Sequence, residues 1–381
     1  MNPKTPMSFS RLGAAVALAA TLGAGPARAD LTVVQVAPLS GPLADTGQLL
    51  QQGANLAFQD ANAKGGIHGQ KIRLISKDDG YKVDETLRLV KEAGAADKPV
   101  AFLGLVGTGN MAALVQKKVI DDLGIPVVGV RTGASALRNP SHPLVYHLRA
   151  SYTAEVDKLV EVASSIGGKR FGVFYQDDPF GQDGLEAMKK AIAQRNLELV
   201  ATGTYEKNTT HVEAAVDTLL KAGNLSAIVL VSNTQATAAF VRAYRDKGGA
   251  AQLYAVSVNN DREIVARIGV DKARGLGIAQ VVPFPFSPVL PVTREYQALL
   301  KKYVPDAPPT VTGMEGFIYG KVLVDALRRA GPAPDREALR KALEGAPFEL
   351  GGFVIDFAPG DHEGSHFVEL TIISRNGSLI R

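Results

Sequence analysis

The chain has 381 residues and contains no cysteine and no tryptophan. The absence of cysteine excludes disulfides, thiolate catalysis and thiolate metal sites, so we expect the stability of an exported chain to come from core packing alone. It also excludes a lipid-modified N-terminal cysteine, and we therefore expect no lipid anchor. The absence of tryptophan weakens the case for a cleft that binds sugars by stacking on flat aromatic rings.

An excess of charge of one sign is also missing. The formal net charge is only +4, and Lys4, Arg11 and Arg28 all lie within the first 29 residues, which hold no acid. Removal of that segment would leave a net charge of +1. A nearly neutral chain lacks the concentrated basic surface that nucleic acid requires, so nucleic acid is not an expected partner.

The N-terminal segment has the pattern of an export signal. Lys4 and Arg11 precede an apolar run over residues 12–23, and Ala27-Arg28-Ala29 then fits the small-x-small cleavage rule. This pattern predicts a cleaved signal peptide over residues 1–29, with Asp30 as the first mature residue. A membrane anchor is the alternative, but the apolar run is too short to cross a bilayer. We therefore expect a periplasmic protein.

Catalytic and cofactor motifs are scarce. The loop GLVGTGN (residues 104–110) lacks the lysine of a phosphate-binding P-loop and the spacing of a dinucleotide fingerprint, and the chain has no G-x-S-x-G nucleophile motif. His362 and His366 flank Glu363, but they fall in an expected loop, where such spacing does not place them on one face. We expect no metal, no cofactor and no catalytic residues.

Apolar patterning predicts an α/β chain with two strand–helix series. The expected strands of the first series are 31–39, 71–76, 99–104 and 125–130, with helices over 47–63, after a cap at Asp84, and after residue 107. The second series, after a break near Ala150, has strands 171–176, 199–205, 227–232 and 252–257, with helices 181–195, 210–222 and 235–247. Helices 293–303, 312–330 and 335–344 follow, and then a hairpin of 352–357 with 366–374. This alternation predicts two doubly wound lobes with parallel sheets.

Loops that follow expected strands carry the candidate ligand groups. In the loop at 104–110, a helix N-terminus and the Thr108 hydroxyl suit a small anion such as a carboxylate, although Thr108 could instead cap the helix. Arg131 and Thr132 would lie beside Thr108 if their strands are neighbours, and Arg131 could pair with a carboxylate or remain solvated. Asp177 and Asp178 could act as an acid/base pair, accept a ligand ammonium, or cap the next helix.

Residues 36–79 (VAPLSGPLADTGQLLQQGANLAFQDANAKGGIHGQKIRLISKDD) resemble the opening of the leucine/isoleucine/valine-binding periplasmic proteins, which are type 1 solute-binding proteins of ABC importers. The likeness continues through GLVGTGN, GIPVVGV, YQDDPFGQDG and VRAYRDKG, over nearly all of the chain after residue 29. It implies two α/β lobes joined by a three-strand hinge, with a ligand enclosed between them. The implied lobes are 30–149 with 282–348, and 150–281 with 349–381.

The same resemblance implies roles for individual residues. The loop 106–110 would bind the ligand carboxylate, with Thr108 in place of a serine, and residues 131–133 would touch the same group. Thr46 and Phe180 match aromatic pocket positions, and Asn233 matches a tyrosine. Together with candidates from the residues themselves, the full candidate ligand-binding set is Thr46, Val106, Gly107, Thr108, Asn110, Arg131, Thr132, Gly133, Tyr152, Asp178, Phe180, Asn233, Val258 and Glu315.

One of these positions departs from the family pattern. Val258 stands where the amino-acid binders of the family carry the acid that holds the ligand ammonium. Either Asp178, Glu315 or another acid replaces it, or the ligand has no α-amino group, because an unpaired ammonium in a closed cleft is unfavourable. We therefore expect 2-oxo or aromatic carboxylates to bind at least as well as the matching amino acids.

The function implied is that of a monomeric periplasmic binding protein, which captures an amino acid or related small carboxylate for an inner-membrane ABC permease. A ligand sensor of the same fold that feeds a receptor or regulator is the alternative. An exported α/β enzyme is a third hypothesis, disfavoured by the absence of a nucleophile motif and of a coherent acid/base pair.

Overall fold

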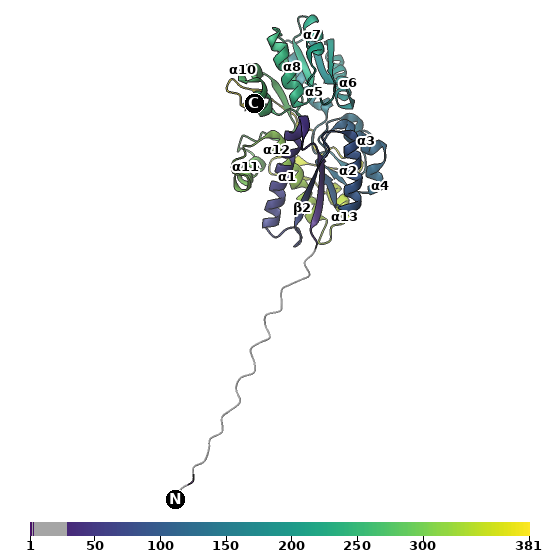
Figure 1. The fold of residues 1–381 in the computed structure, drawn as a ribbon, viewed down its shortest axis with the longest axis vertical. Helices are drawn as coiled ribbons and strands as arrows, with labels where there is room; N and C mark the ends of the chain where they lie inside the picture. The colour runs from purple at the N-terminus through teal and green to yellow at the C-terminus, as the bar shows by residue number, and fades with distance from the viewer. Residues whose placement is uncertain (2, 4–28) are drawn as a thin grey trace.

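The computed structural model describes Met1, Pro3 and residues 29–381, so the predicted signal peptide lies almost wholly outside the described part. Two α/β lobes lie end to end (Figure 1), with α5 to α8 and α10 in one lobe and α1 to α4 and α13 in the other. Within the described residues, no helix is both long enough and apolar enough to span a membrane.

The first lobe is built on a five-stranded sheet in which every neighbouring pair is parallel. The strand order is β2 (Ile72–Asp78), β1 (Leu31–Ala37), β3 (Ala101–Leu103), β4 (Val127–Val128) and β5 (Val145–Tyr146). The intervening helical segments are η1 (Gly41–Leu43), α1 (Ala44–Ala63), α2 (Val83–Ala96), α3 (Thr108–Gln116), α4 (Val119–Leu123) and η2 (Ser135–Leu137). This parallel order brings the carboxyl ends of β1, β3 and β4 to one edge, where ligands bind in open α/β sheets.

The second lobe has a seven-stranded sheet that is parallel except at one edge. Its order is β14 (Leu379–Ile380), β13 (Glu369–Ile373), β10 (Gly277–Gln280), β9 (Gln252–Ala255), β8 (Ala227–Val231), β6 (Arg170–Gln176) and β7 (Glu198–Tyr205). The helices are α5 (Tyr152–Ser165), α6 (Pro179–Gln194), α7 (Glu213–Lys221), α8 (Thr234–Asp246), α9 (Asp261–Ile268) and α10 (Val270–Ala273). β8 is buried along its whole length, as expected for a strand covered on both faces.

Three late helices and a short hairpin complete the first lobe. They are α11 (Pro291–Tyr303), α12 (Val311–Arg329), α13 (Arg336–Glu344), β11 (Phe348–Glu349) and β12 (Val354–Ile355). α12 and α11 pack on α1, and α13 packs on α12. The chain therefore passes between the lobes after β5, after β10 and after β12. The first and third of these passages pair with each other, because the His147 amide donates to the His362 carbonyl at 2.9 Å and the Gly364 amide donates to the His147 carbonyl at 2.8 Å.

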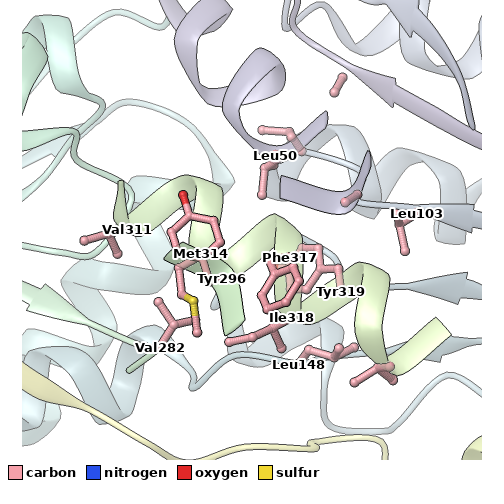
Figure 2. Packing of buried hydrophobic residues seen from close by; sticks show 14 of the residues in the cluster. Leu50, Leu103, Leu148, Val282, Tyr296, Val311, Met314, Phe317, Ile318 and Tyr319 are labelled. Atoms are coloured by element: carbon pink, nitrogen blue, oxygen red, sulfur yellow. The ribbon is translucent and has the colours of Figure 1, made fainter. Parts of the chain in front are cut away.

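Glycines allow α1 and α12 to approach until their backbones touch. A Cβ on Gly316 would lie 2.2 Å from the Leu50 carbonyl oxygen, and one on Gly53 would lie 2.0 Å from the Gly313 carbonyl oxygen. Figure 2 shows the core beside this contact, with Leu50 above Phe317 of α12. The close contact fixes α12, and therefore its buried residue Glu315, relative to the strand ends of the first lobe.

Two local expectations are wrong. The predicted hairpin of 352–357 with 366–374 does not form, because β12 pairs with β11 while β13 pairs with β10 and β14. Asp84 does not cap its helix, since α2 already begins at Val83 after the cap residue Lys82. α4, α5, α9, α10, β5, β10, β11 and β14 were not anticipated. Most of them are short, but α5 buries Val156, Leu159, Val160 and Ala163 at helical spacing, so its periodic signal was present in the sequence.

Candidate ligand-binding cleft

A narrow cleft lies between the lobes, at the carboxyl ends of their strands, where ligands bind in such folds. The first lobe contributes Leu43, Thr46, Tyr81, Val106, Gly107, Thr108 and Arg131 to its lining, and the second contributes Tyr152, Phe180, Asn233 and Val258. Of the predicted set, five residues do not line this cleft: Asn110, Thr132, Gly133, Asp178 and Glu315. A ligand held here would contact both lobes at once.

The N-terminus of α3 forms one wall. Val106 pairs with Arg131 in an isolated parallel bridge, and α3 then begins at Thr108, after Gly107. The first backbone N–H groups of a helix have no partner inside it and carry a partial positive charge, so this wall suits an anion. Gly107 has φ +104, and a Cβ there would lie 2.6 Å from Cε2 of Tyr81. Only glycine fits this turn without displacing the tyrosine.

Two threonines orient a hydroxyl at this wall. The Oγ1 atoms of Thr108 and Thr132 lie 2.7 Å apart, and the Ala134 amide donates to Thr132 Oγ1 at 3.2 Å. Because Thr132 already accepts a hydrogen bond, it can donate its own proton to Thr108, which leaves the Thr108 O–H for a ligand oxygen. Thr108 is the first helical residue and not the cap, while Thr132 positions it from behind.

Arg131 supplies the positive charge of the cleft. Its side chain is 2% exposed, Nη1 donates to Glu315, and Nη2 donates to the Thr312 hydroxyl at 3.3 Å. Its Nε–H makes no hydrogen bond in the described part of the chain. A buried donor without a partner is unfavourable, so the guanidinium is held in place but not fully satisfied.

Glu315 belongs to a buried ionic cluster behind the cleft. It accepts from Arg131, from Arg149 Nη1 at 3.3 Å and from the Tyr319 hydroxyl at 2.5 Å, while Arg149 also pairs with Glu155 at 3.0 Å. Burial by itself raises the pKa of the Glu315 carboxyl, but Arg131, Arg149 and Tyr319 outweigh it and hold that pKa below its usual value. Glu315 is therefore ionised and fully engaged. Arg149 was not predicted as a site residue, and its only signal is its place in LRASY, three residues before Tyr152.

Three aromatic rings also line the cleft. The rings of Tyr152 and Phe180 lie 5.1 Å apart at 54°, and Tyr81 completes the group from the first lobe. Burial raises the pKa of Tyr152 to about 12, so this phenol stays neutral. Gly133 permits the arrangement, because a Cβ there would lie 2.5 Å from the Tyr152 amide nitrogen.

Asp178 and Asn233 cap helices. Asp178 Oδ1 accepts from the amides of Phe180 and Gly181 at the start of α6, and Gln176 donates to Oδ2 at 2.7 Å. Asn233 Oδ1 accepts two amides at the start of α8 in the same way. Of the roles considered for Asp178, capping is therefore the one that the structure shows.

Contacts around the rim join the two lobes. Lys207 Nζ, which follows β7, donates to Asn110 Oδ1 at 3.0 Å and lies 3.9 Å from the centre of the Tyr81 ring. The Ser135 amide of the first lobe donates to Asp183 Oδ1 of α6 at 2.8 Å. These contacts require the lobes to be close together, so they belong to a closed form of the cleft.

The residues considered as metal ligands do not converge on one site, and two of them are bound to other groups. The Nδ1 atom of His362 lies 3.0 Å from the His142 carbonyl oxygen, and its ring stacks on Tyr146 at 4.2 Å. Glu363 accepts from Arg138 at 2.9 Å. Across the described residues, no group of three or more histidine, aspartate or glutamate side chains could hold a metal ion.

Leu43 and Tyr81 are lining residues that the sequence reasoning missed. Leu43 ends η1 just after β1, and Tyr81 follows β2 in the turn DDGY with φ +62. Both therefore lie past the carboxyl ends of first-lobe strands. Thr108 and Arg131 were chosen because they follow the carboxyl ends of parallel strands. The same criterion would have identified Leu43 and Tyr81.

Two α/β lobes that enclose one cleft at their strand ends define a solute-binding protein. Residues 30–378 match the model of the family described as periplasmic binding protein, and the chain belongs to this family. The Leu/Ile/Val-binding protein homolog 7 of Brucella suis biovar 1 is 25% identical over 358 residues, which cover 88% of this chain and 86% of that protein.

Two solved structures extend the comparison. A substrate-binding periplasmic protein from Ralstonia solanacearum is 39% identical, with a TM-score of 0.88 over 92% of this chain and 99% of that one. A possible leucine/isoleucine/valine-binding protein from Rhodopirellula baltica SH 1 is 30% identical, with a TM-score of 0.88 over 94% and 98% of the two chains. The predicted resemblance and fold class are thereby confirmed: the chain is a type 1 periplasmic solute-binding protein, and its family is located outside the cytoplasm.

Proposed function

We propose that this protein is the periplasmic binding component of an ABC importer and that it carries a small organic carboxylate, unchanged, to an inner-membrane permease. The observation that supports the proposal is that the N-terminus of α3 and Arg131 line the same cleft, and that both lobes contribute to this cleft. Helix N–H groups and a guanidinium are complementary to a carboxylate. Phosphate is less suited, because among the described residues Arg131 is the only cationic side chain that lines this cleft, and it is already paired with Glu315.

Binding is expected to favour the closed arrangement of the lobes. A ligand shifts such an equilibrium only by its differential affinity for the two states, and one that touches both lobes gains its full contacts only when they are closed. The Lys207–Asn110 and Asp183–Ser135 contacts then add to the closed state. We also propose that cleavage after Ala29 releases a monomer whose lobes are 30–149 with 282–355 and 150–281 with 356–381; the boundary predicted at 348 moves because the β11–β12 hairpin packs with the first lobe.

We further propose that the site performs no catalysis. Asp178 is used as a cap, so the only adjacent acid pair of the sequence analysis does not form a general acid and base in the cleft. A sensor of the same fold would use the same cleft and is distinguished by its partner alone.

The experiment is recovery of the natural ligand, followed by an uptake assay. We expect mass spectrometry of denatured periplasmic protein to release a small carboxylate, and deletion of the chain to abolish its permease-dependent uptake. Recovery of a converted product would indicate an enzyme. Normal uptake in the deletion strain, combined with loss of a ligand-dependent response, would support the sensor.

Replacement of Thr108 by alanine is expected to weaken binding of that carboxylate by about 0.5–1.5 kcal/mol, or roughly 2- to 13-fold, because one hydroxyl hydrogen bond is lost. Calorimetric titration measures the change. Thr108→Ser keeps the hydroxyl and serves as the matched control, with near wild-type affinity expected. Equal affinities for wild type and Thr108→Ala would mean that the hydroxyl bonds only to Thr132.

A further inference from the structure

We infer that the ligand is an aromatic carboxylate without an ammonium group. This inference rests on the proposed function and narrows it to one class of solute. It depends on three features of the cleft: where its carboxylates are, what its apolar wall is made of, and which donors remain for an anion.

The first feature is that no acid lines the cleft among the described residues, and the acids near it are all engaged. Asp79 accepts from the Tyr81 amide at 2.9 Å and from the Thr86 hydroxyl at 2.6 Å. Both oxygens of Asp178 accept hydrogen bonds within the α6 cap, and both oxygens of Glu315 are held by arginines.

Asp261 lies three residues beyond Val258 and remains to be considered. It is the first residue of α9 and is buried, with hydrogen bonds to the backbone at that helix start. It does not line the cleft, and Val258 does. An α-ammonium in the cleft would therefore meet neutral oxygens and apolar carbon. Burial of a charge without a counter-charge is strongly unfavourable, whereas a deaminated ligand avoids it.

The second feature is the composition of the wall. Tyr81, Tyr152 and Phe180 line the cleft from both lobes, together with the apolar side chains of Leu43, Val106 and Val258. Offset and tilted ring contacts add to the free energy gained by burying apolar area. A flat ring enclosed by three aromatic side chains uses this wall more completely than a branched aliphatic chain does.

The third feature is the set of hydrogen-bond donors at the cleft. The first amides of α3 and the Nε–H of Arg131 have no described acceptor, and the Thr108 hydroxyl is available to a ligand when Thr132 donates to it. The Arg131 side chain is 2% exposed, so the missing acceptor is not replaced by bulk water. A ligand carboxylate beside this group supplies acceptors to several of these donors at once.

The experiment is a panel of matched pairs on ligand-stripped protein, by thermal shift and calorimetry. The pairs are L-phenylalanine with phenylpyruvate and 3-phenylpropanoate, and L-leucine with 4-methyl-2-oxopentanoate, with benzoate in addition. A bound ligand raises Tm by an amount that grows with the logarithm of the ratio of its concentration to its Kd. We expect each deaminated carboxylate to bind at least about tenfold more tightly than its amino acid, and the aromatic members to bind more tightly than the aliphatic one.

Val258→Asp introduces an acid into the cleft. We expect it to reduce or reverse the preference for deaminated carboxylates over amino acids, with a change of about tenfold or more in the ratio of their affinities. The reason is that the new carboxylate pairs with an ammonium and repels an anion. Val289→Asp is the matched control, since Val289 is 74% exposed and lies outside the cleft. The control should keep the wild-type preference.

The possible outcomes distinguish a failure of this inference from a failure of the proposed function. If only amino acids raise Tm, the inference is overturned while the proposed function stands, and Asp261→Asn, Asp178→Asn and Asp79→Asn then locate the acid responsible. If aliphatic carboxylates bind more tightly than aromatic ones, the ring assignment is wrong. If no carboxylate of either kind binds, the proposed function fails and the inference fails with it.

Discussion

Replacement of Glu315 by alanine is expected to reduce the free energy of unfolding by about 3–5 kcal/mol, because removal of one member of a buried ion pair leaves its partners buried and uncompensated. Here the partners are two, Arg131 and Arg149, with side chains 2% and 0% exposed. Arg149 keeps Glu155, but Arg131 has no other acid in the described cluster. For a domain of roughly 150–250 residues each kcal/mol lowers Tm by about 2–4 °C, so we expect a loss of roughly 6–20 °C.

The matched control is Glu92→Ala on α2. Glu92 pairs with Arg88 at 2.8 Å, but the two side chains are 52% and 51% exposed, so loss of the pair is expected to change stability by at most about 0.5 kcal/mol. Comparable losses in the two variants would contradict a special role for the buried cluster. Glu315→Ala should also weaken carboxylate binding, because Arg131 is no longer held at the cleft wall.

The same cluster predicts a pH dependence. The pKa of Glu315 is lower in the folded chain than in the unfolded chain, where it is about 4.3. The contribution of Glu315 is therefore fully present above pH of about 4.3 and is lost as pH falls through the lower folded-state value. In Glu315→Ala, the difference from wild type should be largest near neutral pH and should shrink under acid conditions.

Gly316→Ala is expected to destabilise the first lobe by about 3 kcal/mol, the upper end of the usual range for overpacking. The added Cβ would lie 2.2 Å from the Leu50 carbonyl oxygen, which is backbone and cannot rotate away. α1 and α12 would have to separate, although alanine favours a helix over glycine by about 1 kcal/mol. The midpoint of urea unfolding measures the effect.

Gly109→Ala is the matched control on α3. Its nearest neighbour would be Cδ of Pro179 at 3.8 Å, an ordinary contact, so stability should be unchanged or slightly higher. Wild-type stability in Gly316→Ala would show that the two helices are not held in backbone contact. Because Glu315 precedes Gly316, a shift of α12 should also disturb the pairing of Arg131 and reduce ligand affinity.

The alternation of apolar runs and amphipathic stretches was sufficient to predict the two α/β series, because both periods are local properties of the chain. The loop 106–110 and Arg131 could be chosen for the same reason: each follows a strand, and parallel strands bring such loops to one edge. The late hairpin was misassigned because antiparallel partners are chosen by packing over long sequence distances. β13 pairs with β10, which lies nearly a hundred residues earlier in the chain, and no local pattern specifies that pairing.

The sequence by itself determined the family, the two-lobed fold and the glycine-rich loop that suits an anion. Only the tertiary structure decided how the charges are used. Asp178 and Glu315 were both available to a ligand on sequence grounds, yet one caps α6 and the other joins Arg131 to Arg149. A carboxylate accepts from whichever donors the folded chain brings within about 3 Å, and the donor Arg131 stands 184 residues before the acceptor Glu315. Whether an acid faces the cleft is therefore a property of the packed structure.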